Sequence, residues 1–185
     1  MNAIKNSPVV RSRRAGFTLI EVLVVLAILT VAVGYMARTV GSVGRLGPVS
    51  RETGRAVDAA RATVEQLRSG EFAQIFFNYN ADPADDPGGA GSSPGSDFVA
   101  FGLSPQGGDL DGMVGRIRFP VIGAELREDL VDADLGMPRD LNGDGAIDAL
   151  DHSGDYQILP FSIVLEWTGK TGDRSTELYS TVVKP

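Results

Sequence analysis

The chain has 185 residues, a formal net charge of −7, no cysteine and a single histidine. This length suffices for one domain of ordinary size plus a membrane helix. The absence of cysteine excludes a disulfide framework, and the acidic balance argues against direct binding to DNA or to anionic lipid head groups.

The first predicted element is an apolar helix near the amino terminus. Residues 22–37 contain no charge and no proline, and with residues 17–20 they approach the roughly 20 residues that span a hydrocarbon core. Gly16 and four basic residues precede the run: Lys5, Arg11, Arg13 and Arg14. The carboxylate of Glu21 lies inside it. A charge there costs about 2.5–3.5 kcal/mol and usually has a paired, functional role. The run is too long for a signal peptide, and a simple signal anchor has no use for Glu21.

The segment Gly16-Phe17-Thr18-Leu19-Ile20-Glu21-Val22 resembles the amino-terminal signature of type IV pilins and type II secretion pseudopilins. The resemblance implies that a prepilin peptidase cuts between Gly16 and Phe17 and that the new amino-terminal Phe17 is methylated. It also implies that Glu21 guides assembly. The signature is specific, although it covers only about the first quarter of the chain.

Electrostatics supports this assembly role independently. The Phe17 amine of one subunit and the Glu21 carboxylate of a neighbour would attract strongly in a medium of low dielectric constant, whereas either charge alone is costly. Removal of the leader, with four of the 17 basic residues and no acidic residue, leaves 13 basic residues against 24 acidic ones, a net charge of −11. The basic leader places the amino terminus in the cytoplasm and the acidic body across the membrane.

A weakened helix and an amphipathic helix are expected next. Gly41, Gly44 and Gly47 precede Pro48, so the helix should bend or break there, or melt locally when the subunit packs into a filament. Ser50 is predicted to cap a second helical stretch that ends at Gly70. Its apolar stripe comprises Thr53, Val57, Ala60, Val64 and Leu67, and its outward residues are Arg51, Arg55, Asp58, Arg61, Glu65 and Arg68.

The remaining residues predict a sheet with long loops. Residues 72–79 form a last helical turn or a short strand, and residues 80–96 form a flexible loop. Short strands are expected at 98–103 and 114–122, and one or two helical turns at 125–134. The alternation of residues 161–167 and the return strand 174–183 predict a closing hairpin around the turn 168–173. This hairpin resembles the end of the minor pseudopilin I of type II secretion and of the related minor pilin V.

The loop 140–151 matches the spacing of an EF-hand calcium loop and also resembles dockerin-type loops. The predicted ligands are Asp140, Asn142, Asp144, the Ala146 carbonyl and Asp151, with Asp148 acting through water, and Ile147 should turn inward. Asp151 replaces the usual bidentate glutamate, and Pro138 and Gly154 exclude good flanking helices. We therefore expect a lone Ca²⁺ loop with a structural role. The alternative is an aspartate- and glycine-rich surface turn.

His152 is expected to be a solvent-exposed loop residue. A catalytic dyad with Asp151 is the other interpretation, but no nucleophile motif accompanies it. The sequence also contains no phosphate-binding glycine loop, no zinc-ligand spacing and no basic aromatic patch. We therefore expect that the protein catalyses no reaction and is not an enzyme.

The predicted elements are those of an α+β fold, and the resemblance implies a pilin-like arrangement in which a long amino-terminal hydrophobic helix packs on an antiparallel β-sheet. The expected parts are a leader (1–16), a membrane or filament-core helix (17–40), a glycine-weakened segment with the amphipathic helix (41–70) and a sheet domain (71–185) with a flexible loop (80–97) and the calcium-type loop (140–151).

The expected function is that of a minor pilin or pseudopilin, a structural subunit of a type IV pilus or type II secretion pseudopilus. Its expected partners are prepilin peptidase, other subunits, an inner-membrane assembly platform and the lipid bilayer, with no nucleic acid. It would cross the bacterial inner membrane once, with its globular domain in the periplasm. The alternatives are a membrane-anchored calcium-dependent binding module, which exposed aromatic residues near the loop would support, and a competence pseudopilin for DNA uptake.

Overall fold

The computed structural model describes residues 16–185, except the side chains of residues 39–48. The predicted leader therefore lies outside the described residues, apart from Gly16. The chain divides into two compact units, residues 1–45 and residues 46–185. Helix α1 (Leu19–Ser69) contributes residues to both units, and all strands belong to the second.

Helix α1 begins where the sequence supplies a capping residue. The Thr18 hydroxyl accepts a hydrogen bond from the Glu21 amide at 3.3 Å, and the Thr18 carbonyl accepts one from the Val22 amide at 3.2 Å. Thr18 thus satisfies backbone donors that a helix start leaves without partners. The first part of the helix, Leu19–Arg38, has a mean hydropathy of 2.5 and no buried residue, which fits a membrane span by length and composition.

The helical backbone continues through residues 41–48, so the predicted break there is wrong. Ser50 accordingly lies within α1 and does not cap a separate helix. A glycine costs a helix about 1 kcal/mol and a proline about 3 kcal/mol. These costs are local, and the good helix formers on both sides of the segment keep the backbone helical.

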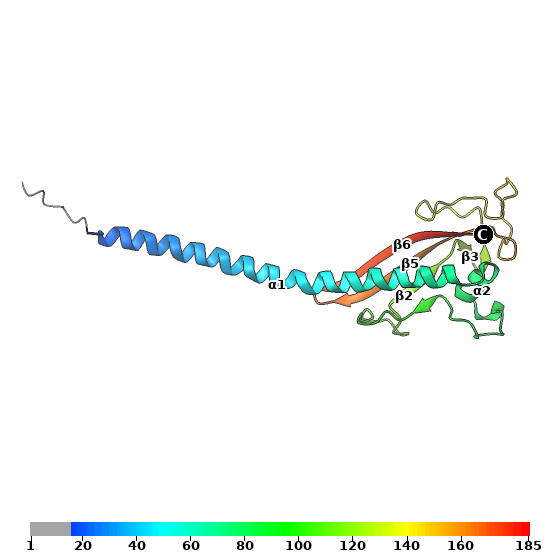
Figure 1. Ribbon diagram of the computed structural model, residues 1–185, viewed down its shortest axis with the longest axis horizontal. Helices are drawn as coiled ribbons and strands as arrows, with labels where there is room; N and C mark the ends of the chain where they lie inside the picture. The colour runs from blue at the N-terminus through cyan, green and yellow to red at the C-terminus, as the bar shows by residue number, and fades with distance from the viewer. Residues whose placement is uncertain (1–15) are drawn as a thin grey trace, which may run out of the picture. The chain divides into compact units, whose positions relative to one another are not determined.

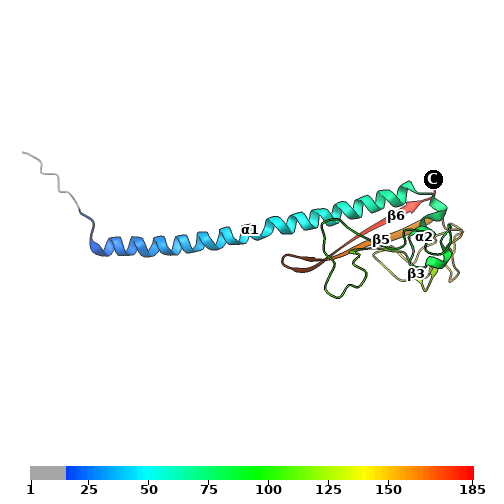
Figure 2. The same ribbon diagram turned by 90° about the horizontal axis from the view of Figure 1, so that it is seen from below.

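The amphipathic part of α1 covers one face of the sheet in the second unit (Figures 1 and 2). Ala60, Val64 and Leu67 are buried as predicted, together with Ala56, whereas Thr53 is exposed and stands outside the apolar stripe. All of the predicted outward residues are exposed: Arg51, Arg55, Asp58, Arg61, Glu65 and Arg68. The helix ends at Ser69, where Gly70 donates to the Leu67 carbonyl at 3.2 Å.

The main sheet has four antiparallel strands in the order β1-β2-β5-β6. The strands are β1 (Asp97–Phe98), β2 (Gly115–Arg118), β5 (Ile158–Gly169) and β6 (Gly172–Val183). β5 and β6 form the predicted closing hairpin, which is longer than expected because Gly169 pairs with Gly172 around a two-residue turn. The described chain therefore has the expected α+β arrangement of a long apolar helix and an antiparallel sheet.

The segments before the main sheet are largely helical turns. Residues 72–79 form a 3₁₀ turn (Phe72–Gln74) and the short helix α2 (Ile75–Tyr79), which decides between the two predicted alternatives in favour of helix. A second 3₁₀ turn, Pro83–Asp85, lies in the loop that follows. The Phe76 ring packs edge-on against Phe119, next to β2, and joins α2 to the core.

A second, two-stranded sheet consists of β3 (Val121–Ile122) and β4 (Glu125–Leu126). The helical turns predicted for residues 125–134 are therefore wrong. β4 is bonded on both sides: Val121 is the register partner of Leu126, and the Leu126 carbonyl accepts from the His152 amide at 2.9 Å. These pairings hold the backbone extended although its charged residues favour a helix.

The core of the second unit lies between α1 and the main sheet. Alternate residues of β5 point into it, from Leu159 to Trp167, and each is at most 2% exposed. Leu126 and Leu141, both 0% exposed, belong to the same buried cluster. Leu141 belongs to the predicted metal loop, and the Leu126 amide donates to Asp151 of that loop. The hydrophobic core therefore anchors the segments from which the candidate site is built.

Candidate functional site

The predicted processing site lies immediately before α1. Residues 16–18 carry no regular secondary structure, and the helix starts at Leu19. Phe17 is 81% exposed, and Glu21 is exposed in the first turn of the helix. The bond between Gly16 and Phe17 is therefore in non-helical backbone, and the carboxylate of Glu21 lies one turn further along.

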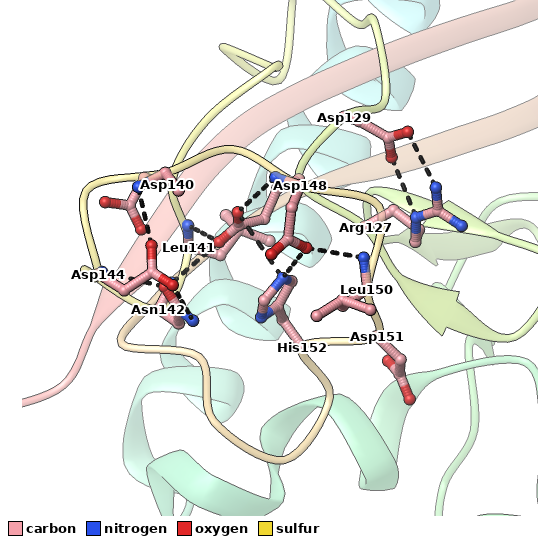
Figure 3. A network of polar contacts seen from close by, with 12 residues as sticks. Arg127, Asp129, Asp140, Leu141, Asn142, Asp144, Asp148, Leu150, Asp151 and His152 are labelled. Atoms are coloured by element: carbon pink, nitrogen blue, oxygen red, sulfur yellow. Dashed lines mark hydrogen bonds and ion pairs between the residues drawn. The ribbon is translucent and has the colours of Figure 1, made fainter.

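The first half of the loop 140–151 folds around its own polar side chains. The two carboxylate oxygens of Asp140 accept from the amides of Gly143 and Gly145 at 2.6 and 2.8 Å. Asn142 accepts from the Asp144 amide at 3.0 Å, and Asp144 accepts from the Ala146 amide at 2.8 Å. Three of the predicted ligand side chains are thus gathered in one tight turn (Figure 3).

The second half of the loop is arranged differently. The carboxylate of Asp151 accepts from the amides of Leu126 and Ser153, each at 3.0 Å, and points away from Asp140 and Asp144 (Figure 3). Ile147 is 51% exposed, so its predicted inward position is wrong. Leu141, which is fully buried, is the residue that fixes the loop to the core.

Asp148 also faces a partner outside the turn. One of its carboxylate oxygens accepts from the Leu150 amide at 2.7 Å and lies 3.1 Å from Nε2 of His152. The hydrogen bond from the Leu150 backbone, together with the one to His152, lowers the pKa of Asp148. Asp148 is therefore placed against His152, whereas the side chains of Asp140, Asn142 and Asp144 accept hydrogen bonds from the backbone amides of residues 143–146.

His152 is buried at 3% exposure, so its predicted position in solvent is wrong. Its Nδ1 lies 3.1 Å from Asp155, its Nε2 lies 3.1 Å from Asp148, and Glu128 is 3.7 Å from Nε2. Burial by itself lowers the pKa of His152. The hydrogen bonds that the His152 ring makes to the carboxylates of Asp148 and Asp155, with the nearby charge of Glu128, outweigh this effect and raise the pKa of His152 above its ordinary value of 6.5. Because these partners do not include Asp151, the predicted alternative of a catalytic dyad of His152 with Asp151 is wrong.

Glu128 is the site residue that the sequence reasoning missed. Its side chain is 1% exposed, and Oε1 accepts from the amides of Leu141 and Asn142 at 2.6 and 3.2 Å. Oε2 accepts from the Asp148 amide at 3.3 Å. Glu128 thus links β4 to both halves of the loop, which no spacing within residues 140–151 could indicate.

A signal for Glu128 does exist in the sequence. Leu126, Glu128 and Leu130 alternate with Arg127 and Asp129, which is the two-residue period of a half-buried extended segment. The structure follows this period, with Leu126 and Glu128 buried and Asp129 exposed. Arg127 keeps to the outer side, where it binds Asp129 through two nitrogens at 3.0 and 2.9 Å.

Together, Glu128, Asp148 and His152 form a group that could hold a metal ion. Their ligand atoms all lie within 4.8 Å of one another. Two of the three residues are buried, and they come from two separate chain segments. The part of the chain described by the structure brings only one of the predicted metal ligands, Asp148, into this group.

Comparison with known families finds one match, to the prokaryotic N-terminal methylation motif, over residues 11–37. The match includes Gly16, Phe17 and Glu21 and ends within the apolar part of α1. No curated protein and no solved structure matches the chain. The match thus concerns only the amino-terminal segment. The sheet unit and its loop lie outside the matched residues.

Proposed function

From the match to the prokaryotic N-terminal methylation motif over residues 11–37, we propose that this chain is a pilin- or pseudopilin-type protein and a minor structural subunit of a type IV pilus or type II secretion pseudopilus. It is processed by prepilin peptidase and assembled from the inner membrane with other subunits. The observation that carries the proposal is the motif itself, placed at the start of an exposed 20-residue apolar helix.

Cleavage is proposed between Gly16 and Phe17. A peptidase needs an extended, accessible backbone, and residues 16–18 are non-helical, with Phe17 81% exposed. Because Thr18 caps α1, removal of the leader would leave only two residues in front of the helix. The new amine of Phe17 would then lie directly at the helix start, where methylation would modify it.

Glu21 is proposed to guide assembly by pairing with the Phe17 amine of a neighbouring subunit. The carboxylate lies in the first turn of an apolar helix and is exposed in the single chain. An unpaired carboxylate is costly inside a membrane or a filament core, and a neighbouring cation at close range offsets that cost. Repetition of this pair between subunits would fix their axial stagger.

The proposed location is the bacterial inner membrane, with the sheet unit in the periplasm before extraction into the filament. The four basic residues ahead of the apolar helix support this orientation, because basic residues accumulate on the cytoplasmic side: Lys5, Arg11, Arg13 and Arg14. The assembly platform of the inner membrane and the lipid bilayer are the corresponding partners.

We further propose that the loop 140–151 binds Ca²⁺ and stabilises a domain that has no disulfide. The oxygens of Asp140, Asn142 and Asp144 are gathered in one turn, which supports a cation of this kind. The Ala146 carbonyl, Asp151 and, through water, Asp148 complete the proposed set, and Asp151 would have to leave its hydrogen bonds with Leu126 and Ser153 to join it.

The processing proposal is tested by intact-mass and amino-terminal analysis of the membrane-extracted protein, made with and without prepilin peptidase. We expect a chain that begins at methylated Phe17 only when the peptidase is present, and an unprocessed chain for Gly16→Leu. The matched control Gly34→Leu alters a helical glycine with open space around it and should be processed normally. A wild-type chain that keeps Met1, or is cut beyond the apolar helix, would overturn the proposal.

A further inference from the structure

Glu128, Asp148 and His152 converge on one point beside the loop, and we propose that they form a binding site for a divalent transition metal such as zinc. The three ligand atoms are Oε2 of Glu128, Oδ1 of Asp148 and Nε2 of His152. This group lies apart from the turn formed by Asp140, Asn142 and Asp144, and it shares only Asp148 with the proposed calcium ligands. The proposal goes beyond the filament function and does not rest on it.

The distances between the ligand atoms fit a metal ion. Nε2 of His152 lies 3.1 Å from Oδ1 of Asp148 and 3.7 Å from Oε2 of Glu128. Two ligands of a tetrahedral zinc ion, with bonds of about 2.0–2.1 Å, are about 3.3 Å apart. The two distances bracket this value, and the ligand atoms of Glu128 and Asp148 lie within 4.8 Å of each other.

The donor types distinguish this site from the turn at Asp140–Asp144. One imidazole nitrogen and two carboxylate oxygens suit zinc and related metals. Ca²⁺ prefers six to eight oxygens and gains little from a nitrogen. The loop 140–151 therefore contains an all-oxygen turn, while its residue Asp148 joins His152 and the distant Glu128 in a mixed nitrogen and oxygen group.

Outer contacts orient two of the three ligands. Nδ1 of His152 lies 3.1 Å from a carboxylate oxygen of Asp155, which is the carboxylate–histidine arrangement that holds metal-binding imidazoles in place. Oε1 of Glu128 is held by the amides of Leu141 and Asn142, which turns Oε2 toward His152. The group is thus positioned before any ion binds.

The burial and the negative charge of the group favour binding of a cation. The side chains of His152 and Glu128 are 4% and 1% exposed, whereas that of Asp148 is 38% exposed. The two carboxylates repel each other unless a positive charge lies between them, and Glu128 is almost completely withdrawn from water. The exposed side of Asp148 gives an ion access and leaves room for water as the fourth ligand. A proton bound to Nε2 of His152 would compete with the metal ion, and the experiment below distinguishes proton from metal.

The test uses the full-length chain in detergent micelles, stripped of metal and titrated with Zn²⁺ in mildly alkaline buffer by calorimetry. We expect one ion per chain. Substitution of Co²⁺ should give the visible absorption of a four-coordinate ion with a nitrogen ligand. His152→Asn should weaken zinc binding by at least about 100-fold, since the loss of an outer partner alone costs 10–100-fold. Asp155→Asn removes such an outer partner and should weaken zinc binding by about 10–100-fold.

Two controls make the result specific. Asp129→Asn changes the neighbour of Glu128 on the outer side, where it binds Arg127, and should leave zinc binding unchanged. Asp140→Asn should also leave it unchanged, because Asp140 belongs to the separate turn. Asp148→Asn provides a second ligand variant at a partly exposed position, in case His152→Asn fails to fold.

Absence of stoichiometric zinc binding by the wild-type chain would overturn the proposal. Unchanged affinity in both His152→Asn and Asp148→Asn, or an equal loss in Asp140→Asn, would overturn it as well. None of these results bears on processing at Gly16, so the filament proposal stands or falls separately.

Discussion

The amino-terminal segment and the acidic loop both place charges where water is scarce, but they do so by opposite means. Glu21 is exposed in the single chain, and in the proposed function its partner is the Phe17 amine of a neighbouring subunit. Glu128 is buried and receives three backbone amides and a nearby imidazole from its own chain. A carboxylate left exposed in an apolar helix therefore suggests assembly, whereas one enclosed by its own fold suggests local structure or a bound ion.

The largest expected effect tests the role in assembly that is proposed for Glu21. Glu21→Ala should leave cleavage after Gly16 intact and lower incorporation into filaments more than about 100-fold, because loss of one partner of a buried ion pair costs about 3–5 kcal/mol. Incorporation is measured as the fraction of processed subunit that sediments with sheared filaments. Glu65→Ala, which removes an exposed carboxylate from the second unit's part of α1, is the control. Normal incorporation of Glu21→Ala would contradict the pairing argument.

The next effect concerns what anchors the loop. Leu141→Ala should lower the free energy of unfolding by about 2–5 kcal/mol, because Leu141 is fully buried in the core cluster. Ile147→Ala, at a position that is 51% exposed, should change it by no more than about 0.5 kcal/mol. Thermal or denaturant unfolding of both variants in detergent checks the difference. Equal losses would mean that Ile147 packs inward in solution.

The smallest expected effect concerns calcium. Ca²⁺ at 100 times its dissociation constant should stabilise the chain by about 2.7 kcal/mol. The double variant Asp140→Ala, Asp144→Ala should lower the melting temperature and lose this response. Melting with and without a calcium-selective chelator measures the effect, and Asp129→Asn serves as the control for charge. If the chelator does not change the melting of the wild-type chain, the loop is an ordinary turn.

The sequence alone determined the features that depend on neighbouring residues. The apolar helix, its charged flanks and the motif around Phe17 are linear patterns. Each can be read from consecutive residues, because a membrane span and a peptidase recognition site are both contiguous segments. The amphipathic stripe through Ala60, Val64 and Leu67 and the closing hairpin also follow from short-range periodicity. In each case the physical cause lies within a few residues of the feature.

The tertiary structure decided what depends on distant segments. Residues 125–126 form a strand, and not the predicted helical turn, because β3 pairs on one side and His152 bonds on the other. His152 is buried for the same reason, and Ile147 is exposed because Leu141 already occupies the core position. Glu128 reaches the loop from 13 residues before Leu141. Long-range backbone pairing brings these groups together, and no local spacing encodes such pairing.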